Sequence, residues 1–338
     1  MKKNKYLLKI AAIKDSAPDN GLRPHQVRAL VKLDKNKGVV LDHSTGSGKT
    51  LTFLKAVEKS HIENPTNRAL IMSPASLTTN VDKEISKHNL SIDKTRLDVL
   101  SYEKAVNESD RLKKNKYAIV IADEAHRLRN TGTKRHASLS EIISSADKRL
   151  LATGTTTYNH VSDVAPLVNI AAGKEVLPSG KKEFEAKYVK KHLEQPPLLK
   201  RILGAHPVEK SNLVNKGDLA KKIRPFMDKY DIADDPKAKN DFPQKIEKVI
   251  EIPMSSEQHT LYRYMEGKLP FHLRLKVRMN VPLDGKETSQ LNAFASAIRQ
   301  VSNSPRSFMP NNKRTSPKIE KATESLARSY LSDKNFRG

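Results

Sequence analysis

A short apolar run that leads through a glycine loop into a lysine constrains this chain more than any other feature. The run is GVVLDH (38–43), the loop is STGSG (44–48), and Lys49 and Thr50 follow. Such loops let backbone N–H groups converge on phosphate oxygens, and the N-terminus of the next helix adds a favourable dipole. The pattern therefore predicts a buried strand, a phosphate-binding loop and a helix. An ordinary glycine turn before a helix is the alternative interpretation.

The candidate ATP-binding residues of this loop are expected to bind different parts of a triphosphate and its metal. Lys49 is expected to reach the β and γ phosphates, and the Thr50 hydroxyl is expected to bind Mg²⁺. His43 stands where the strict pattern has glycine, so the sequence matches the looser Gly-x-Gly-Lys-Thr form. The loop residues assigned to ATP are Thr45, Gly46, Ser47, Gly48, Lys49 and Thr50.

The stretch YAIVIAD (117–123) supplies a metal partner for the loop, because an apolar run ends there in Asp123 and is followed by Glu124. Asp123 is expected to hold Mg²⁺, and Glu124 is expected to orient or deprotonate the attacking water. With Lys49, these carboxylates form the predicted catalytic set, and ATP and Mg²⁺ are the predicted cofactors. A solvated acidic strand end is the alternative when the stretch is taken alone.

Further apolar runs place both stretches in one α/β domain. The runs are nearly continuous, as expected for strands covered on both faces, and they alternate with helix-compatible segments such as 49–60 and 81–88. The pattern predicts an open, doubly wound parallel sheet whose binding edge is formed by the carboxyl ends of its strands. The expected strands are 38–43, 68–73, 97–102, 117–123 and 148–154.

Beyond residue 175 the sequence becomes basic and helix-compatible, which predicts a helical insertion that includes KKEFEAKYVKKHLE (181–194). QKIEKVIEIPM (244–254) alternates enough to predict a strand that returns to the sheet. A helix is expected next, with Ser255 or Ser256 as its cap.

Three later segments carry weaker signals. FHLRLKVRMN (271–280) alternates basic and apolar residues, which fits either a row of cations along a groove or a surface strand. PLDGKETS (282–289) is rich in turn residues, and NSPRSFMPNNKRTSP (303–317) has the composition of a linker.

Composition indicates a soluble intracellular protein with a polyanionic partner. Lys and Arg number 62 against 38 Asp and Glu, a net charge of +24, so nucleic acid is expected and a merely solubilising surface is the alternative. The absence of cysteine excludes disulfides, thiolate metal sites and cysteine nucleophiles. No segment reaches the roughly 18 apolar residues of a membrane span, and Lys9 and Lys14 interrupt the signal-like N-terminus. The expected location is the cytoplasm or nucleoid, or the host cytoplasm if the protein is viral.

The segment DEAHRLRN (123–130) resembles motif II of superfamily-two, DEAH-box-like helicases, and its tail resembles the Swi/Snf-type branch. This resemblance implies a P-loop NTPase of the RecA-like class, and it adds His126 to the ATP-binding residues. LRPHQ (22–26) resembles the adenine-reading segment of that branch, which implies that Gln26 recognises the base.

Three further segments resemble motifs of the same branch in the same order. LIMSPASLTTN (70–80) resembles motif Ia and LSYEKA (100–105) resembles motif Ib, which implies contacts with a nucleic-acid backbone. LLATGTTTYNHVSDVAPLVNI (150–170) resembles motif III, although the family usually has proline at the place of Thr156. The implied residues are Ser73, Pro74, Ser101 and Tyr102 for nucleic acid, and Thr153, Gly154 and Thr155 for coupling.

The resemblance continues more loosely downstream, through segments 223–227, 242–262 and 291–305 that flank the helical protrusions of the branch. DKYDI (228–232) replaces the usual LRRxK, so the role of that segment is not transferred. The implied domains are a RecA-like ATP-binding lobe (1–172), a helical protrusion with return to the lobe (173–255), a second protrusion with linker (256–315) and the start of a C-terminal lobe (316–338).

The resemblance implies the motor lobe of a DNA-dependent ATPase, a helicase or translocase that moves along duplex or branched DNA. In such motors a second RecA-like lobe supplies arginines to the γ-phosphoryl transition state. That lobe is expected to be absent from this chain, which is therefore expected to bind ATP and to hydrolyse it slowly unless the lobe is supplied in cis or in trans. A monomer without membrane contact is expected. An RNA helicase and a non-catalytic nucleic-acid-binding scaffold are the alternatives.

Overall fold

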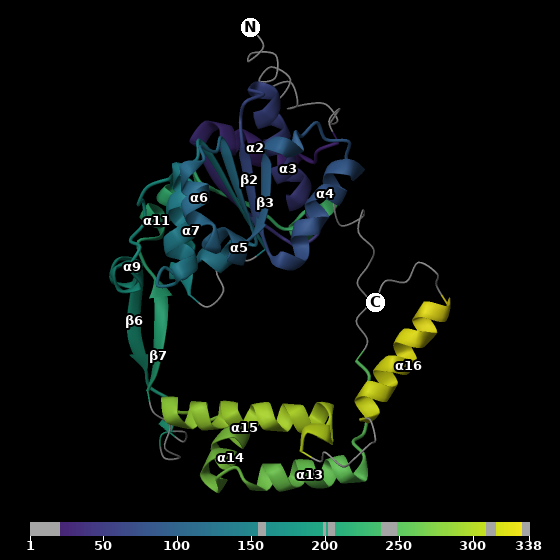
Figure 1. Cartoon of the computed structure of the whole chain (residues 1–338). Helices are drawn as coiled ribbons and strands as arrows, with labels where there is room; N and C mark the ends of the chain where they lie inside the picture. The colour runs from purple at the N-terminus through teal and green to yellow at the C-terminus, as the bar shows by residue number, and fades with distance from the viewer. Residues whose placement is uncertain are drawn as a thin grey trace. The chain divides into compact units, whose positions relative to one another are not determined.

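The chain divides into two compact units (Figure 1). The computed structural model describes residues 21–154, 160–198, 201, 207–237, 249–308 and 316–332. Residues 1–190 and 212–243 belong to the first unit, and residues 191–211 and 244–338 belong to the second. The expected domain boundaries stay a prediction, and residues 212–237 contain a strand of the first unit's sheet.

A parallel sheet of six strands forms the centre of the first unit. Its order is β3-β2-β4-β5-β1-β8, and neighbouring strands run parallel throughout. The five strands expected from apolar runs are confirmed, each within about two residues of its expected bounds. The strands are β1 (Gly38–His43), β2 (Ala69–Ser73), β3 (Leu97–Ser101), β4 (Ile119–Asp123), β5 (Lys148–Thr153) and β8 (Met227–Tyr230).

Helices cover both faces of this sheet, which confirms the doubly wound α/β prediction (Figure 1). Successive strand side chains point to opposite faces, so Val39 and Leu41 pack in one core cluster and Val40 packs in the other. The first face carries α2 (Pro24–Asn36), α3 (Lys49–Glu63) and α4 (Thr78–Lys87). The second face carries α5 (Tyr102–Asn107), α6 (Ser109–Lys114), α7 (Lys134–Ser145) and α8 (Val164–Ala172).

The strand that joins the sheet from the second half of the chain is β8, and the prediction of a returning strand at 244–254 was wrong where it can be checked. Residues 249–254 form no strand, and 244–248 lie outside the described residues. β8 pairs with β1 from Val40↔Met227 to His43↔Tyr230. The sequence MDKY lacks an apolar run, and polar contacts to a buried aspartate hold this strand instead.

The basic segment 181–194 is helical only in its first half, which corrects the expected helix. α9 (Lys181–Tyr188) packs through buried Phe184 and Tyr188, and β6 (Val189–Glu194) then forms a two-stranded sheet with β7 (Val208–Leu213). Lys191 bridges Glu209 across this pair at 3.1 Å, and Lys210 pairs with Glu194. α11 (Lys216–Ile223) follows β7.

The described part of the second unit downstream of residue 248 is helical. α13 (Ser256–Gly267) begins as predicted, since the Ser255 hydroxyl accepts a 3.2 Å hydrogen bond from the Gln258 N–H. The buried Gln258 side chain donates to the Val301 carbonyl at 2.7 Å, which ties α13 to α15 (Gly285–Asn303). α16 (Pro317–Ser332) lies further along the chain.

Two weaker sequence predictions for this unit need correction, and a third cannot be followed over its full length. Residues 271–278 form a helix, α14 (Phe271–Arg278), and not a surface strand. The turn-rich segment 282–289 contains the start of α15, because Asp284 and Glu287 form a capping box there. Residues 309–315 of the expected linker lie outside the described residues.

None of the helices in the described ranges combines the length and the apolar character that crossing a bilayer requires.

Candidate nucleotide-binding site

The sheet brings the two sequence stretches to the same edge, at the carboxyl ends of two strands separated by a third. The glycine loop follows β1, the acidic pair ends β4, and Thr153 ends β5, which lies between those two strands. In the register of the sheet, Asp42 pairs with Thr153 and Asp123 pairs with Ala152. Open parallel sheets bind ligands at this edge.

The loop has the backbone geometry of a phosphate cradle. Gly46 and Gly48 have φ angles of 84° and 82°, a region that side chains other than glycine rarely adopt. A Cβ on Gly48 would lie 2.6 Å from Nε2 of Gln26, so the Gln26 side chain would have to shift. No side chain caps the first turn of α3, which leaves its N–H groups directed at the loop.

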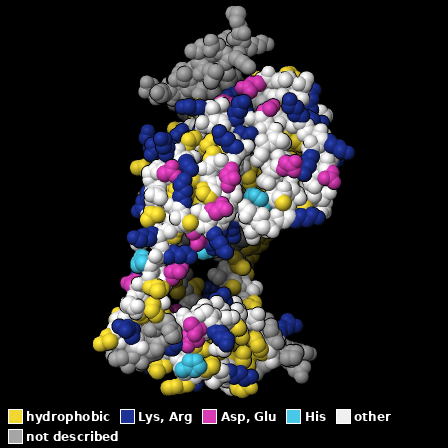
Figure 2. All heavy atoms as spheres, turned by 90° about the vertical axis from the view of Figure 1, so that its left-hand side faces the viewer, with side chains coloured by type: hydrophobic (Ala, Val, Ile, Leu, Met, Phe, Trp, Pro, Cys, Tyr) yellow, Lys and Arg dark blue, Asp and Glu magenta, His cyan; other side chains and the backbone are white. Residues whose placement is uncertain are grey.

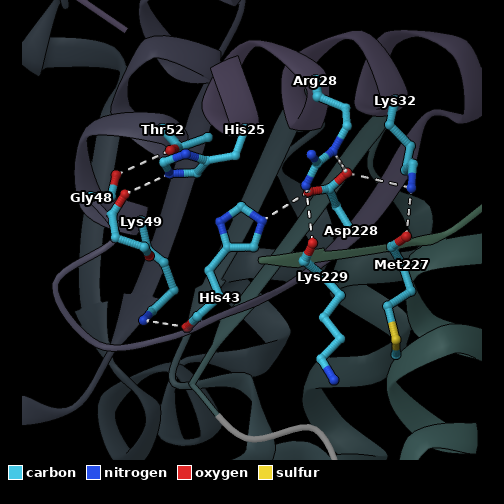
Figure 3. Close-up of polar contacts among 11 residues, drawn as sticks. His25, Arg28, Lys32, His43, Gly48, Lys49, Thr52, Met227, Asp228 and Lys229 are labelled. Carbon is cyan, nitrogen blue, oxygen red and sulfur yellow. Dashed lines mark hydrogen bonds and ion pairs between the residues drawn. The ribbon is translucent and has the colours of Figure 1, made fainter. Parts of the chain in front are cut away.

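Lys49 lies across the mouth of this loop. Its ammonium group donates hydrogen bonds to the carbonyls of His43 at 2.8 Å and Ser44 at 3.2 Å (Figure 3). Burial lowers the pKa of Lys49, while the charges of Glu124 and Asp123 oppose that shift. A Cβ on Gly154 would lie 3.9 Å from the lysine Nζ, so the residue after β5 borders the same space.

The carboxylates of Asp123 and Glu124 repel each other. Burial, followed by the charge of Glu124, raises the pKa of Asp123 to about 6. Glu124 has a left-handed backbone, with φ 52° and ψ 47°, which costs a residue other than glycine about 1–2 kcal/mol. A bound cation would relieve the repulsion within this pair.

His126 and Thr153 join the acidic pair as expected from the sequence. His126 Nδ1 lies 3.2 Å from the Glu124 carboxylate and 3.4 Å from the Thr153 hydroxyl. Thr155, the third expected coupling residue, lies outside the described residues. The side chains therefore link the ends of β4 and β5.

Gln26 and His25 support the loop from α2. The Gln26 side chain accepts a hydrogen bond from the Arg23 N–H at 2.7 Å and donates one to the Gly48 carbonyl at 2.9 Å. His25 Nε2 lies 2.9 Å from the Ser47 carbonyl. Base recognition by Gln26 stays a prediction, and its contacts in this structure are with the protein.

Sequence reasoning missed the group beside the loop that is centred on Asp228 (Figure 3). This carboxylate is 1% exposed; it accepts hydrogen bonds from Arg28 at 2.9 and 2.8 Å and lies 2.9 Å from His43 Nε2. Burial alone would raise the pKa of Asp228, but the bonds from His43 and Arg28 outweigh it and hold that pKa far below the usual range. Lys32 adds a further charge at 3.5 Å.

His43, which departs from the strict phosphate-loop pattern, thus contacts Asp228 of segment 228–232, which departs from the family pattern. Tyr230 extends the contact, since its ring stacks on His25 with centroids 3.6 Å apart and its carbonyl accepts a 3.0 Å hydrogen bond from the Ser44 N–H. The only signal for this group in the sequence was that both positions depart from the pattern.

Of the residues assigned to nucleic acid, three are buried. Tyr102 is 0% exposed and donates its hydroxyl to the Asp123 carbonyl at 2.7 Å, so the expected direct contact by this side chain is not possible in this structure. Ser73 and Pro74 are buried as well. Ser101 is half-buried, and its hydroxyl accepts a hydrogen bond from the Lys104 N–H at 3.1 Å.

Two protein-family models match overlapping ranges of this chain. A model described as the SNF2-related domain matches residues 92–307, which is more than half of the chain. The chain belongs to the SNF2-related family. A second model, the res subunit of type III restriction enzymes, matches residues 19–158 of this SNF2-related chain, so the two matches together extend from residue 19 to residue 307.

Curated relatives and solved structures agree with membership of the SNF2-related family. "Putative ATP-dependent RNA helicase L538" of Acanthamoeba polyphaga mimivirus is 34% identical over 164 residues, which are 48% of this chain and 35% of that protein. "DNA repair and recombination protein RAD54" of Oryza sativa is 25% identical over 327 residues, 84% of this chain and 31% of that protein. The SNF2-related chain thus spans about a third of the length of these relatives.

The structure titled "Sulfolobus solfataricus SWI2/SNF2 ATPase core in complex with dsDNA" shares the fold of the SNF2-related chain. It matches with a TM-score of 0.51 at 20% identity, over 94% of this chain and 67% of that chain. The Swi/Snf-type resemblance and the RecA-like fold expected from the sequence are confirmed.

Proposed function

We propose that this chain is the ATP-binding motor lobe of a DNA-dependent ATPase that moves along duplex or branched DNA. The observation that carries the proposal is the convergence of the Lys49 loop, the Asp123–Glu124 pair and Thr153 at three neighbouring strand ends. Phosphate-binding backbone, metal-binding carboxylate and water-orienting carboxylate are the parts that phosphoryl transfer requires.

The residues of this site fit ATP with Mg²⁺. Two glycines with positive φ leave the cradle free of side chains, and the raised pKa of Asp123 marks a carboxylate that a cation stabilises. Mg²⁺ takes one or two carboxylates and completes its shell with phosphates and water, and Asp123 offers such a carboxylate. When bound, Mg²⁺ neutralises charge that develops on the phosphates.

The residues of the chain then have separate roles. Loop N–H groups and Lys49 would bind the phosphates, Thr50 and Asp123 would hold Mg²⁺, and Glu124 would orient the attacking water and accept its proton at the carboxylate. His126 holds the Glu124 carboxylate and links it to Thr153.

Nucleic acid is the proposed partner because the chain is strongly basic and its relatives act on nucleic acids by name. Figure 2 shows one face on which Lys and Arg side chains are spread with Asp and Glu between them. Contacts of Lys and Arg with phosphates bind nucleic acid without sequence preference. The solved neighbour was determined with double-stranded DNA, and RAD54 is named for DNA repair. The mimivirus relative is named an RNA helicase, so RNA is the second candidate.

Stimulated ATP hydrolysis tests this function. We expect duplex DNA to raise the ATPase rate of the chain supplied with a second RecA-like lobe, and RNA to compete poorly. Lys49→Ala should weaken ATP binding at least tenfold, whereas Glu124→Gln should retain binding and lose hydrolysis. Stronger stimulation by single-stranded RNA would favour the RNA helicase. Full function in both variants would favour a non-catalytic scaffold.

A further inference from the structure

Tyr102 lies next to the nucleotide site without lining it. Its side chain is fully buried and belongs to the first residue of α5, directly after β3. Its hydroxyl donates a 2.7 Å hydrogen bond to the main-chain carbonyl of Asp123. The bond therefore joins α5 to the peptide that connects the two carboxylates of the site.

That peptide carries the unusual backbone of the site. The Asp123 carbonyl and the Glu124 N–H belong to one peptide group, and the Glu124 N–H donates to Asp123 Oδ1 at 3.0 Å. Glu124 has a φ of 52°, a conformation that persists in a residue other than glycine only where surrounding contacts fix it. Rotation of this peptide would break the Tyr102 bond and the Glu124 N–H bond together.

The orientation of the same peptide determines where both carboxylates point. With it in place, the Glu124 carboxylate lies 3.2 Å from His126. A right-handed or extended conformation at Glu124 would turn its side chain away from the loop.

We propose that Tyr102 is a positioning residue for ATP hydrolysis, because its hydroxyl fixes the peptide between Asp123 and Glu124 and thereby aims one carboxylate at the metal and the other at the attacking water. The inference rests on the proposed ATP site. The tyrosine acts through the main chain and touches neither nucleotide nor metal.

Mg²⁺-dependent nucleotide binding separates this role from a merely structural one. The 338-residue chain is titrated with a fluorescent ATP analogue in the presence and absence of Mg²⁺, and the ratio of the two dissociation constants measures how well the carboxylates meet the metal. Tyr102→Phe keeps the ring in its buried place and removes only the hydroxyl. We expect metal-free binding to stay within about twofold of wild type and the ratio to fall about tenfold.

Tyr117→Phe is the matched control. Tyr117 is also buried, at 3% exposure, and donates its hydroxyl to Asp98 at 2.7 Å, at the opposite end of the sheet. The Tyr117→Phe variant should lower the unfolding temperature as Tyr102→Phe does. It should leave the ratio of the dissociation constants with and without Mg²⁺ unchanged. An unchanged ratio in folded Tyr102→Phe, or an equal fall in both variants, would overturn the positioning role. A wild-type chain that binds no ATP analogue would instead overturn the proposed function.

Discussion

Asp123 is the residue whose chemistry most depends on its surroundings. Its carboxyl is buried beside a second carboxylate, and its pKa is therefore raised to about 6. A site built only for stability would neutralise such a group with a partner. Perturbed acids of this kind are instead common at functional sites, where a ligand provides the missing charge.

We expect Asp123→Asn to stabilise the nucleotide-free chain at pH 8. The folded chain holds the acid proton to about pH 6, whereas the ordinary value is 3.8, so folding takes up a proton between these two values. The destabilisation is therefore absent below about pH 4, grows between pH 4 and 6, and is complete above pH 6, at about 3 kcal/mol. Urea unfolding at pH 4 and pH 8 measures it.

The exposed Asp110→Asn is the control for that comparison, since it removes an acid without burial. Equal stability of wild type and Asp123→Asn at pH 8 would contradict the raised pKa. Loss of Mg²⁺-dependent ATP binding in Asp123→Asn is expected in the same samples.

Sequence patterns predicted single residues well where a motif has a fixed geometry and poorly where contacts are distant. The loop, Asp123, Glu124 and His126 lie together as expected. Tyr102 shows the limit, because the resemblance of its segment to motif Ib implied a contact with nucleic acid while its ring is buried. No local pattern reveals whether the side chain after a strand turns inward or outward.

At the scale of elements, β8 completes the support of the loop although its sequence gives little sign of a strand. Apolar strands were predictable because burial on both faces requires continuous apolar runs. β8 departs from this rule, since Asp228 at its centre is buried and paired with groups about 185–200 residues away. α14 was missed because alternation of basic and apolar residues predicts a strand. Over eight residues the same sequence also fits about two turns of a helix.

We expect Asp228→Asn to destabilise the first unit by about 3 kcal/mol at pH 7, since it leaves Arg28 and its neighbours without their buried counter-charge. Because the pKa of Asp228 is depressed, its stabilisation is present above about pH 4 and is lost as the pH falls further. The stability difference from wild type should therefore shrink below pH 4. Thermal unfolding across this pH range measures it, with exposed Asp234→Asn as the control. A difference that is absent at pH 7 would show that the ion pairs add no net stability.

At the scale of the whole molecule, every described residue of the nucleotide site belongs to the first unit. The second unit contributes helices with exposed aromatic side chains, among them Phe271 and Tyr264. In the function proposed above, ATP binding depends on residues of the first unit, and hydrolysis depends also on a second RecA-like lobe.

We expect the 338-residue chain to bind ATP and to hydrolyse it at a rate that rises by about 10³ or more when a second RecA-like lobe with its arginines is supplied. Single-turnover hydrolysis with and without that lobe measures the increase. A lobe in which those arginines are replaced by alanine is the control. Rapid DNA-stimulated hydrolysis by the chain alone would contradict the dependence.

Because His43 contacts Asp228, we expect the phosphate loop and the edge strand β8 to evolve together. Among homologous chains, the histidine is expected to occur with the acid and to disappear with it. Protein engineers who transplant the loop HSTGSGKT into another ATPase would have to transplant its distant counterpart too, because an unaccompanied imidazole at the root of the loop would be left in an apolar interior.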